Sequence, residues 1–443
     1  MAAITKILKK ALSEYYFFLS NPRDMRVLLI TNMIYAFVLP VVDIFVSAYI
    51  MRFTNNDFTL VAYYQLAIYT GIPLTFFING FLLKKIKIAN LYSFGMLLSG
   101  ISMLFMMTLD HLNFAGVVFS GLIMGASFGF FWANRDFLAL DTTNDKNRNY
   151  YYGLETFFFT ITSIIIPLIV GWFIISSKTL GWFGEHRAYQ VITLCVFILT
   201  IISSIVIHRE KFKNPKQKKF LHFHFDRLWH KMLFLAGLKG LAQGYLVTAP
   251  AILIMYLIGD EGSLGTIQAI SGIVTAIVLY LLGRFSKPEH RIYIFAVGLL
   301  IFVAGTMANA IMFSATGAMV FMLAMVLFRP LHDIAYFPIQ MRVIDVLSRK
   351  EKRNEFAYIF NHEFGLFVGR VFGLVMFLLL THYVSEVFAL KYSLLIIALL
   401  QLISIPVAKM VIKHTSKEEF KSNGQDVRLR DVDDKLVVEP LVQ

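Results

Sequence analysis

The most informative side chains of this chain are ionisable groups placed inside long apolar stretches. Lys239 stands about ten residues into one stretch, which is roughly 15 Å at 1.5 Å per helical residue. Glu363 and Arg370 share another stretch and stand two helical turns apart. A charge within a bilayer costs about 3 kcal/mol or more unless it faces protein, water or a partner. These residues therefore predict a polar site inside a membrane, suited to binding a charged solute and exchanging protons.

We sort the polar residues of the apolar stretches by the chemistry that each type can perform. Substrate binding is predicted for Asn32, Tyr35, Trp132, Asn134, Arg135, Lys239, Gln243, Arg329 and Arg370. Proton coupling is predicted for His332, Asp333 and Glu363. A carboxylate dried in a closing cavity holds its proton more readily, and a neighbouring arginine reverses this. Asp136, Glu155 and Arg148 are predicted to gate the site near the basic loops.

Several of these residues also have a purely structural interpretation. Arg135 with Asp136, and Arg329 with Asp333 at i,i+4 spacing, are equally well explained as ion pairs that hold helices together. Glu155 fits the partner of a basic residue near a helix end. Asp43 is interpreted equally well as a solvated residue near the membrane surface. Lys239 needs either an acid on another helix or an anionic substrate, because its own helix offers no acid.

Twelve apolar stretches must position these side chains, since a bilayer core of about 30 Å needs roughly 20 apolar residues per crossing. Their predicted bounds are 25–51, 59–83, 89–109, 113–140, 150–176, 187–208, 229–258, 263–284, 290–313, 316–345, 355–382 and 386–412. Of the 443 residues 58% are hydrophobic and 16% are charged, whereas a soluble domain carries about 25% charged residues. We therefore predict an all-α membrane protein of twelve transmembrane helices.

Lys and Arg concentrate in every second loop, which predicts the topology. Basic loops stay on the cytoplasmic side, so both termini are expected there. The net charge of +13 follows from these loops, and no nucleic-acid partner is expected. The predicted division is a cytoplasmic amphipathic segment (1–24), a first six-helix bundle (25–208), a basic linker (209–228), a second bundle (229–412) and a flexible tail (413–443).

Several classes of chemistry lack the residues that they need. The single cysteine, Cys195, allows no intramolecular disulfide. His222, His224 and His230 do not have the spacing of a standard metal site. The chain has no nucleotide-binding P-loop and no nucleophile with an adjacent base. We expect a non-enzymatic protein without a metal or other cofactor.

The chain resembles the major facilitator superfamily over about residues 25–412. Gly80-Phe81-Leu82-Leu83-Lys84-Lys85-Ile86-Lys87 is similar to the family's loop G-x-L-x-D-R-x-G-R-R, with Lys84 in place of Asp, and Gly283-Arg284-Phe285-Ser286-Lys287 echoes it. Gly121, Gly125 and Gly129 give the close helix packing common in such bundles. Arg148-Asn149 and Arg353-Asn354 open corresponding spans of the two halves. The resemblance implies two pseudo-symmetric bundles that rock about a central cavity, with spans one, four, seven and ten lining it, in a monomer.

The expected function is secondary active transport of a small organic solute across the cytoplasmic membrane by alternating access, with H⁺ as the coupling ion. The excess of Lys239, Arg329, Arg370 and Arg135 over nearby acids favours an anionic or zwitterionic solute. A multidrug efflux antiporter is an alternative, and it predicts an apolar cavity with an isolated acid. A lipid flippase is another alternative, and it needs a lateral opening with an apolar vestibule.

Overall fold

The computed structural model describes residues 15–109, 111–143, 147–214, 222, 224–285, 290–353 and 355–419. Within these ranges, twelve helical segments are long and apolar enough to cross a membrane. The predicted all-α class and the twelve spans are thereby confirmed. The predicted amphipathic segment lies largely outside the described residues, as does most of the tail.

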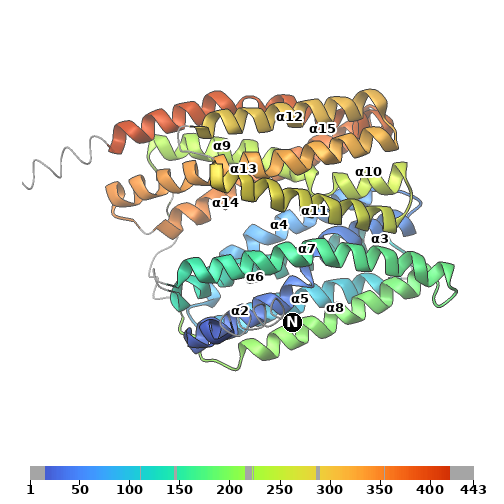
Figure 1. Ribbon diagram of the computed structural model, residues 1–443, viewed down its shortest axis with the longest axis horizontal. Helices are drawn as coiled ribbons and strands as arrows, with labels where there is room; N and C mark the ends of the chain where they lie inside the picture. The colour runs from blue at the N-terminus through green and yellow to red at the C-terminus, as the bar shows by residue number, and fades with distance from the viewer. Residues whose placement is uncertain are drawn as a thin grey trace, which may run out of the picture.

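The first half contains six spans, which occupy the lower part of Figure 1. The first span is divided into α2 (Arg23–Ala36), the π-helix η1 (Val41–Phe45) and α3 (Val46–Phe53). The others are α4 (Phe58–Leu82), α5 (Ile88–Met107), α6 (Phe114–Thr142), α7 (Arg148–Thr179) and α8 (Glu185–Ile207).

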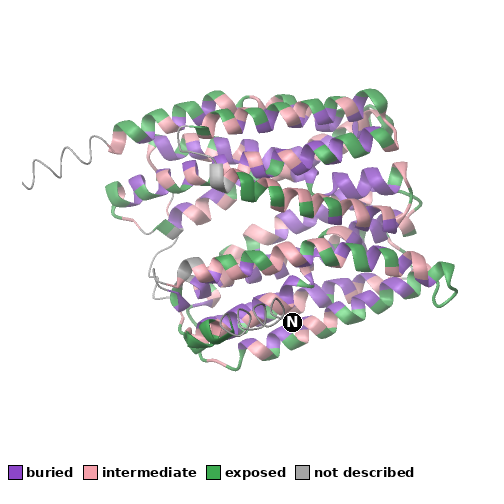
Figure 2. Ribbon diagram, viewed as in Figure 1, coloured by how far each residue is buried: buried purple, intermediate pink, exposed green. Residues whose placement is uncertain are grey.

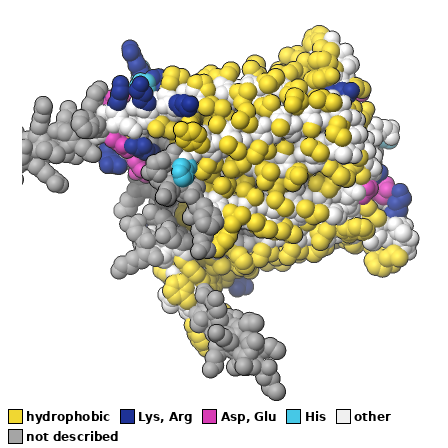
Figure 3. All heavy atoms as spheres, turned by 45° about the horizontal axis from the view of Figure 1, so that its top comes forward, with side chains coloured by type: hydrophobic (Ala, Val, Ile, Leu, Met, Phe, Trp, Pro, Cys, Tyr) yellow, Lys and Arg dark blue, Asp and Glu magenta, His cyan; other side chains and the backbone are white. Residues whose placement is uncertain are grey.

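The second half repeats this pattern in the upper part of Figure 1. Its first span is divided into α9 (Arg227–Leu246) and α10 (Ala249–Leu257). The others are α11 (Glu261–Phe285), α12 (Arg291–Met312), α13 (Ala315–Glu351), α14 (Glu355–Tyr383) and α15 (Glu386–Gln401), whose span continues to Glu419. On the face shown in Figure 3, exposed apolar side chains form a broad band, and charged groups gather toward the two ends. Buried residues lie mainly on the inward faces of the helices (Figure 2).

Two helices extend beyond their predicted ends because polar residues bind them together outside the apolar band. Arg342 pairs with Glu419 at 2.5 Å, and Lys350 pairs with both Glu418 and Asp226. Burial would raise the pKa of Asp226, but hydrogen bonds from Lys350 and from the Leu228 N–H lower this pKa below its usual value. The last helix therefore continues to Glu419, past the predicted end at residue 412.

The first and seventh spans are interrupted at matching places. Tyr35 precedes Pro40 by five residues, and Tyr245 precedes Pro250 by the same interval. Proline has no N–H, so Pro250 leaves the carbonyl of Leu246 without its helical donor. Interrupted helices at corresponding positions of two repeats are typical of transporter binding sites. The breaks thus point to the middle of the bundle as the place to look for a site.

Glycines bring α9 and α14 into close contact and thereby fix the side chains that the two helices carry. A Cβ atom at Gly369 would lie 2.7 Å from the backbone nitrogen of Leu241 and closer still to the carbonyl of Gly237. We predict that Gly369→Ala destabilises the protein by about 1–3 kcal/mol, because rigid backbone must move apart. Thermal unfolding in detergent checks this. Gly153→Ala is the matched control, since a Cβ there meets nothing within 4 Å. Equal melting temperatures for the two variants would contradict the prediction.

Candidate functional site

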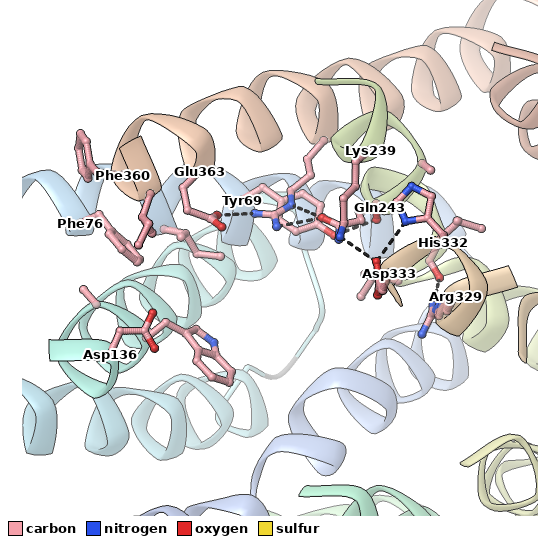
Figure 4. Close-up of a pocket in the computed structure, with 18 of the residues that line it drawn as sticks. Tyr69, Phe76, Asp136, Lys239, Gln243, Arg329, His332, Asp333, Phe360 and Glu363 are labelled. Atoms are coloured by element: carbon pink, nitrogen blue, oxygen red, sulfur yellow. Dashed lines mark hydrogen bonds and ion pairs between the residues drawn. The ribbon is translucent and has the colours of Figure 1, made fainter. Parts of the chain in front are cut away.

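A cavity of about 540 Å³ lies between the two halves. Its walls come from α4, α6, α9, α13 and α14 (Figure 4). Spans four, seven and ten contribute, as the family resemblance implied, and spans two and eleven add a large share. The lining includes Tyr69, Ile72, Phe76, Trp132, Asp136, Lys239, Gln243, Leu246, Arg329, His332, Asp333, Phe360, Glu363 and Arg370.

Lys239 finds its partner on another helix. Its Nζ lies 2.8 Å from Oδ1 of Asp333, and the same oxygen is 3.1 Å from Nδ1 of His332. The ammonium also stands over the rings of Tyr336 and Phe337, at 4.2 and 3.9 Å from their centroids. Asp333 therefore pairs with Lys239 of α9, and the i,i+4 pair with Arg329 that the sequence suggested does not form.

Arg370 is held between helices of both halves. Its guanidinium donates to Oε1 of Gln243 at 3.0 and 3.2 Å and lies 3.4 Å from a carboxylate oxygen of Glu363. It also stands over the ring of Tyr69, whose hydroxyl donates to the backbone carbonyl of Gln243 at 3.1 Å. Any change in the spacing of the halves must therefore alter the surroundings of Arg370.

Arg329 stands at the other end of this row of polar groups from Glu363 (Figure 4). Its Nη2 donates to the carbonyl of Leu246 at 3.0 Å. This is the carbonyl that Pro250 leaves without a helical donor, so Arg329 compensates for the break in the seventh span. Arg329 nevertheless remains exposed, which means that the cavity reaches it.

In the first half, charged groups form a separate network behind the cavity wall. Arg135 binds both carboxylate oxygens of Glu155, and its Nη1 lies 2.7 Å from Asp136. Glu155 also accepts a hydrogen bond of 2.6 Å from Asn32, which in turn is bound by Tyr92. The network ties α2, α5, α6 and α7 together, and only Asp136 of its members lines the cavity.

The predicted site residues thus fall into two groups. Nine of them line the cavity: Trp132, Asp136, Lys239, Gln243, Arg329, His332, Asp333, Glu363 and Arg370. Five others lie between helices in this conformation: Asn32, Tyr35, Asn134, Arg135 and Glu155. Tyr35 packs on Phe131 at 4.4 Å between ring centroids, and Asn134 pairs with Asn79. Substrate contacts by Asn32, Tyr35, Asn134 and Arg135 stay predictions, and the side chain of Arg148 lies outside the described residues.

A second cavity, of about 570 Å³, adjoins the first. The two share Tyr69, Ile72, Val247 and Arg329 in their walls. The second is lined by the interrupted first span together with α4, α7, α11 and α13, and it contains Asp43, Gln65 and Gln268. Sequence reasoning assigned none of these three polar residues to a site. The break at Pro40, three residues before Asp43, was the available signal.

The halves are joined at the end opposite the basic loops by a group that we call the latch: Arg52, Tyr189 and Glu261. Arg52 binds both carboxylate oxygens of Glu261, at 2.9 and 2.6 Å, and also the carbonyl of Gly259. Tyr189 donates to Glu261 at 3.1 Å. Glu261 is only 1% exposed. Near the latch, glycines 171 and 265 let α7 and α11 touch backbone to backbone. This end of the molecule is therefore closed.

We predict that Glu155→Gln destabilises the first half by about 1–3 kcal/mol, because Arg135 loses its buried carboxylate partner and keeps only the half-exposed Asp136. Chemical unfolding in detergent, followed by Trp fluorescence, measures this. Glu185→Gln is the control, since its pair with Lys178 is at the exposed surface and is worth about 1 kcal/mol or less. Similar unfolding midpoints for the two variants would show that the Arg135 network does not contribute to the stability of the protein.

Comparison with known proteins agrees with this architecture. The family model of the Major Facilitator Superfamily matches residues 28–374. An uncharacterised protein of Bacillus subtilis, YqgE, is 23% identical over 401 residues, covering 89% of this chain and 90% of the relative. Among solved structures, a bacterial homologue of the human lysosomal transporter Spinster, inward-facing and unoccupied, has a TM-score of 0.63 at 15% identity, with 90% and 99% of the chains covered. A bacterial homologue of the iron transporter ferroportin, also inward-facing, has a TM-score of 0.63 at 14% identity, with 89% and 98% covered.

Proposed function

Because the chain belongs to the Major Facilitator Superfamily, it is a multi-pass secondary transporter and not an enzyme, and we propose that it moves an anionic or zwitterionic organic solute with protons. The solute binds in the cavity between the halves, which then rock to expose it on the other side. The row of ion pairs in the first cavity is the observation that carries this proposal.

The charges in this row explain how solute and proton are coupled. The sequence suggested an excess of bases, yet the lining holds equal numbers: Asp136, Asp333 and Glu363 against Lys239, Arg329 and Arg370. An entering carboxylate must therefore compete with an internal one for Lys239 or Arg370. A displaced Asp333 or Glu363, left in a drying cavity without its cation, is stabilised by taking up a proton. Binding of the anion and of the proton thus support each other.

The direction of opening follows from the loops and the latch. Basic loops stay on the cytoplasmic side, so the latched end faces outward and both termini lie in the cytoplasm. This conformation is then inward-facing. The protein belongs in the bacterial inner membrane. One chain is sufficient for transport, because both halves of the cavity come from the same polypeptide.

Multidrug efflux has one observation in its favour. Asp43 stands in a mainly apolar wall, as expected for a site that binds lipophilic cations. Arg329 lines the same cavity and repels such cations, which makes this the weaker candidate. The space between α4 and α14 measures only about 10 Å³, roughly one water molecule, so a lipid flippase has no lateral opening at this position.

We predict that Glu363→Gln and Asp333→Asn each abolish solute accumulation driven by a pH gradient while retaining exchange of solute across proteoliposomes. Each variant lacks one of the two acids that the proposed cycle must protonate, but the cavity keeps its cations. Radiolabelled uptake and an enclosed pH dye measure the two activities over panels of organic anions, zwitterions and lipophilic cations.

Glu386→Gln is the matched control, because Glu386 is exposed at the end of a span and lies outside both cavities. Transport of neutral or cationic compounds alone would sink the proposed substrate class. Accumulation that survives in both acid variants would sink the proposed proton coupling.

A further inference from the structure

The charged residues of the two cavities are not all paired. Asp333 pairs with Lys239, Glu363 with Arg370, and Asp136 with Arg135. Within the described part of the chain, one acid and one base in the cavity walls lack an oppositely charged partner. These two residues are Asp43 and Arg329.

Asp43 and Arg329 line the same second cavity and are both exposed, although each belongs to a membrane-spanning segment. They line one cavity without forming an ion pair with each other. Unpaired charges in a membrane interior are tolerated where they face a water-filled cavity, and such residues commonly mark a substrate pathway. The cavity, at about 570 Å³, is in the range of small-molecule sites.

The donors of Arg329 suit the anionic end of such a ligand. Its Nη2 is used by the carbonyl of Leu246, which fixes the guanidinium in place. Within the described residues, Nε and Nη1 have no partner, so N–H groups on both remain free to donate to an anionic oxygen. Arg329 also lies in the wall shared with the first cavity, next to the proton-coupling acids.

The surroundings of Asp43 suit the cationic end. An ammonium group has three N–H donors and needs several oxygen acceptors. Asp43 lies in the π-helical segment η1, and such segments frequently occur at functional sites. Ser163 of α7 and Val326 of α13 line this cavity, and each stands four positions before a proline of its own helix. A proline cannot donate to the carbonyl four residues earlier, so these oxygens are freer to accept.

We propose that the transported solute is a zwitterion, with its anionic group on Arg329 and its cationic group on Asp43. This inference rests on the proposed transport function and narrows its substrate class. Because Arg329 lines both cavities, the anionic group of the solute lies beside the ion pairs of the first cavity, which act as the proton-coupling elements, and the cationic group lies in the second cavity.

The test measures binding to the purified full-length protein by thermal shift and calorimetry. The probes are matched triplets with one carbon skeleton each: α- and ω-amino acids, the carboxylic acids without the amine, and the amines without the carboxylate. We expect at least one amino acid to bind about tenfold or more tightly than both of its analogues, since each lost charged hydrogen bond has an effect of this size. Asp43→Asn should remove this preference over the carboxylic acid, and Arg329→Gln the preference over the amine.

Controls separate this site from a simple internal balance of charge. Glu386→Gln and Arg187→Gln neutralise exposed residues and should leave binding unchanged. The double variant Asp43→Asn with Arg329→Gln should lose the amino acid entirely. If the two residues merely balance each other, the double variant binds as the unmodified protein does, and the proposal is overturned.

The proposal is also overturned if no amino acid exceeds both analogues, or if Asp43→Asn leaves affinity unchanged. Those results leave transport itself standing, because gradient-driven uptake of singly charged solutes is measured separately in proteoliposomes.

Discussion

Lys239→Gln should lower solute transport by about tenfold or more, because it removes the cation for which the solute carboxylate and Asp333 compete, and a charged hydrogen bond has an effect of this size. The variant also removes the cation whose displacement from Asp333 is proposed to trigger proton uptake, so coupling should stop. Initial rates of uptake into proteoliposomes give the size of the loss. Thermal unfolding shows how much of it reflects stability.

The double variant Lys239→Gln with Asp333→Asn distinguishes two roles of the pair. Removing both charges should restore the melting temperature, since no unpaired charge remains. It should not restore gradient-driven accumulation if the pair couples protons. If the double variant recovers both stability and accumulation, the pair of Lys239 and Asp333 stabilises the protein but does not couple protons.

Glu261→Gln should open the latched end of the molecule. The carboxylate of Glu261 is almost fully buried and holds Arg52, Tyr189 and the carbonyl of Gly259 in one cluster across the halves. Loss of about 3 kcal/mol from this conformation shifts the balance between states by more than about 100-fold. Pulsed electron paramagnetic resonance measures the distance between spin labels at Leu180→Cys and Val384→Cys. This distance should be longer in Glu261→Gln than in the same labelled protein with Glu261 intact. Both positions are exposed and lie near this end.

Lys178→Gln is the control for the latch, because it breaks an exposed ion pair that lies within the first half. It should leave the spin-label distances unchanged. An unaltered distance in Glu261→Gln would mean that the helix contact between α7 and α11, and not the latch, keeps this end closed.

Much of the fold could be predicted from the sequence, for a simple physical reason. A bilayer demands long apolar helices and places basic loops on one side, and both are local properties of the chain. Span bounds were therefore predicted closely, except where α13 and the last helix leave the membrane and bind each other through Arg342 and Glu419.

The partners of the charged residues could not be predicted in the same way. Local spacing favoured an ion pair between Arg329 and Asp333. In the structure Asp333 instead pairs with Lys239 of another helix, and Arg329 donates a hydrogen bond to the Leu246 carbonyl that Pro250 leaves without a helical donor. Asn32, like the cavity residues, is a polar residue within an apolar stretch. Its side chain nevertheless donates a hydrogen bond to Glu155 and does not line the first cavity. Which face of a helix meets a cavity depends on packing between distant segments, and no local pattern encodes it.

Alternating access is the central claim, and paired distance measurements test it most directly. In a Cys195→Ser background, which removes the single native cysteine, one labelled pair at Leu180→Cys and Val384→Cys reports on the latched end. A second pair at Lys84→Cys and Arg349→Cys reports on the basic end. Across a pH series and in the Glu261→Gln background, the account predicts reciprocal changes, so that one distance shortens as the other lengthens. Distances that stay fixed under all these conditions, or that change in the same direction, would contradict it.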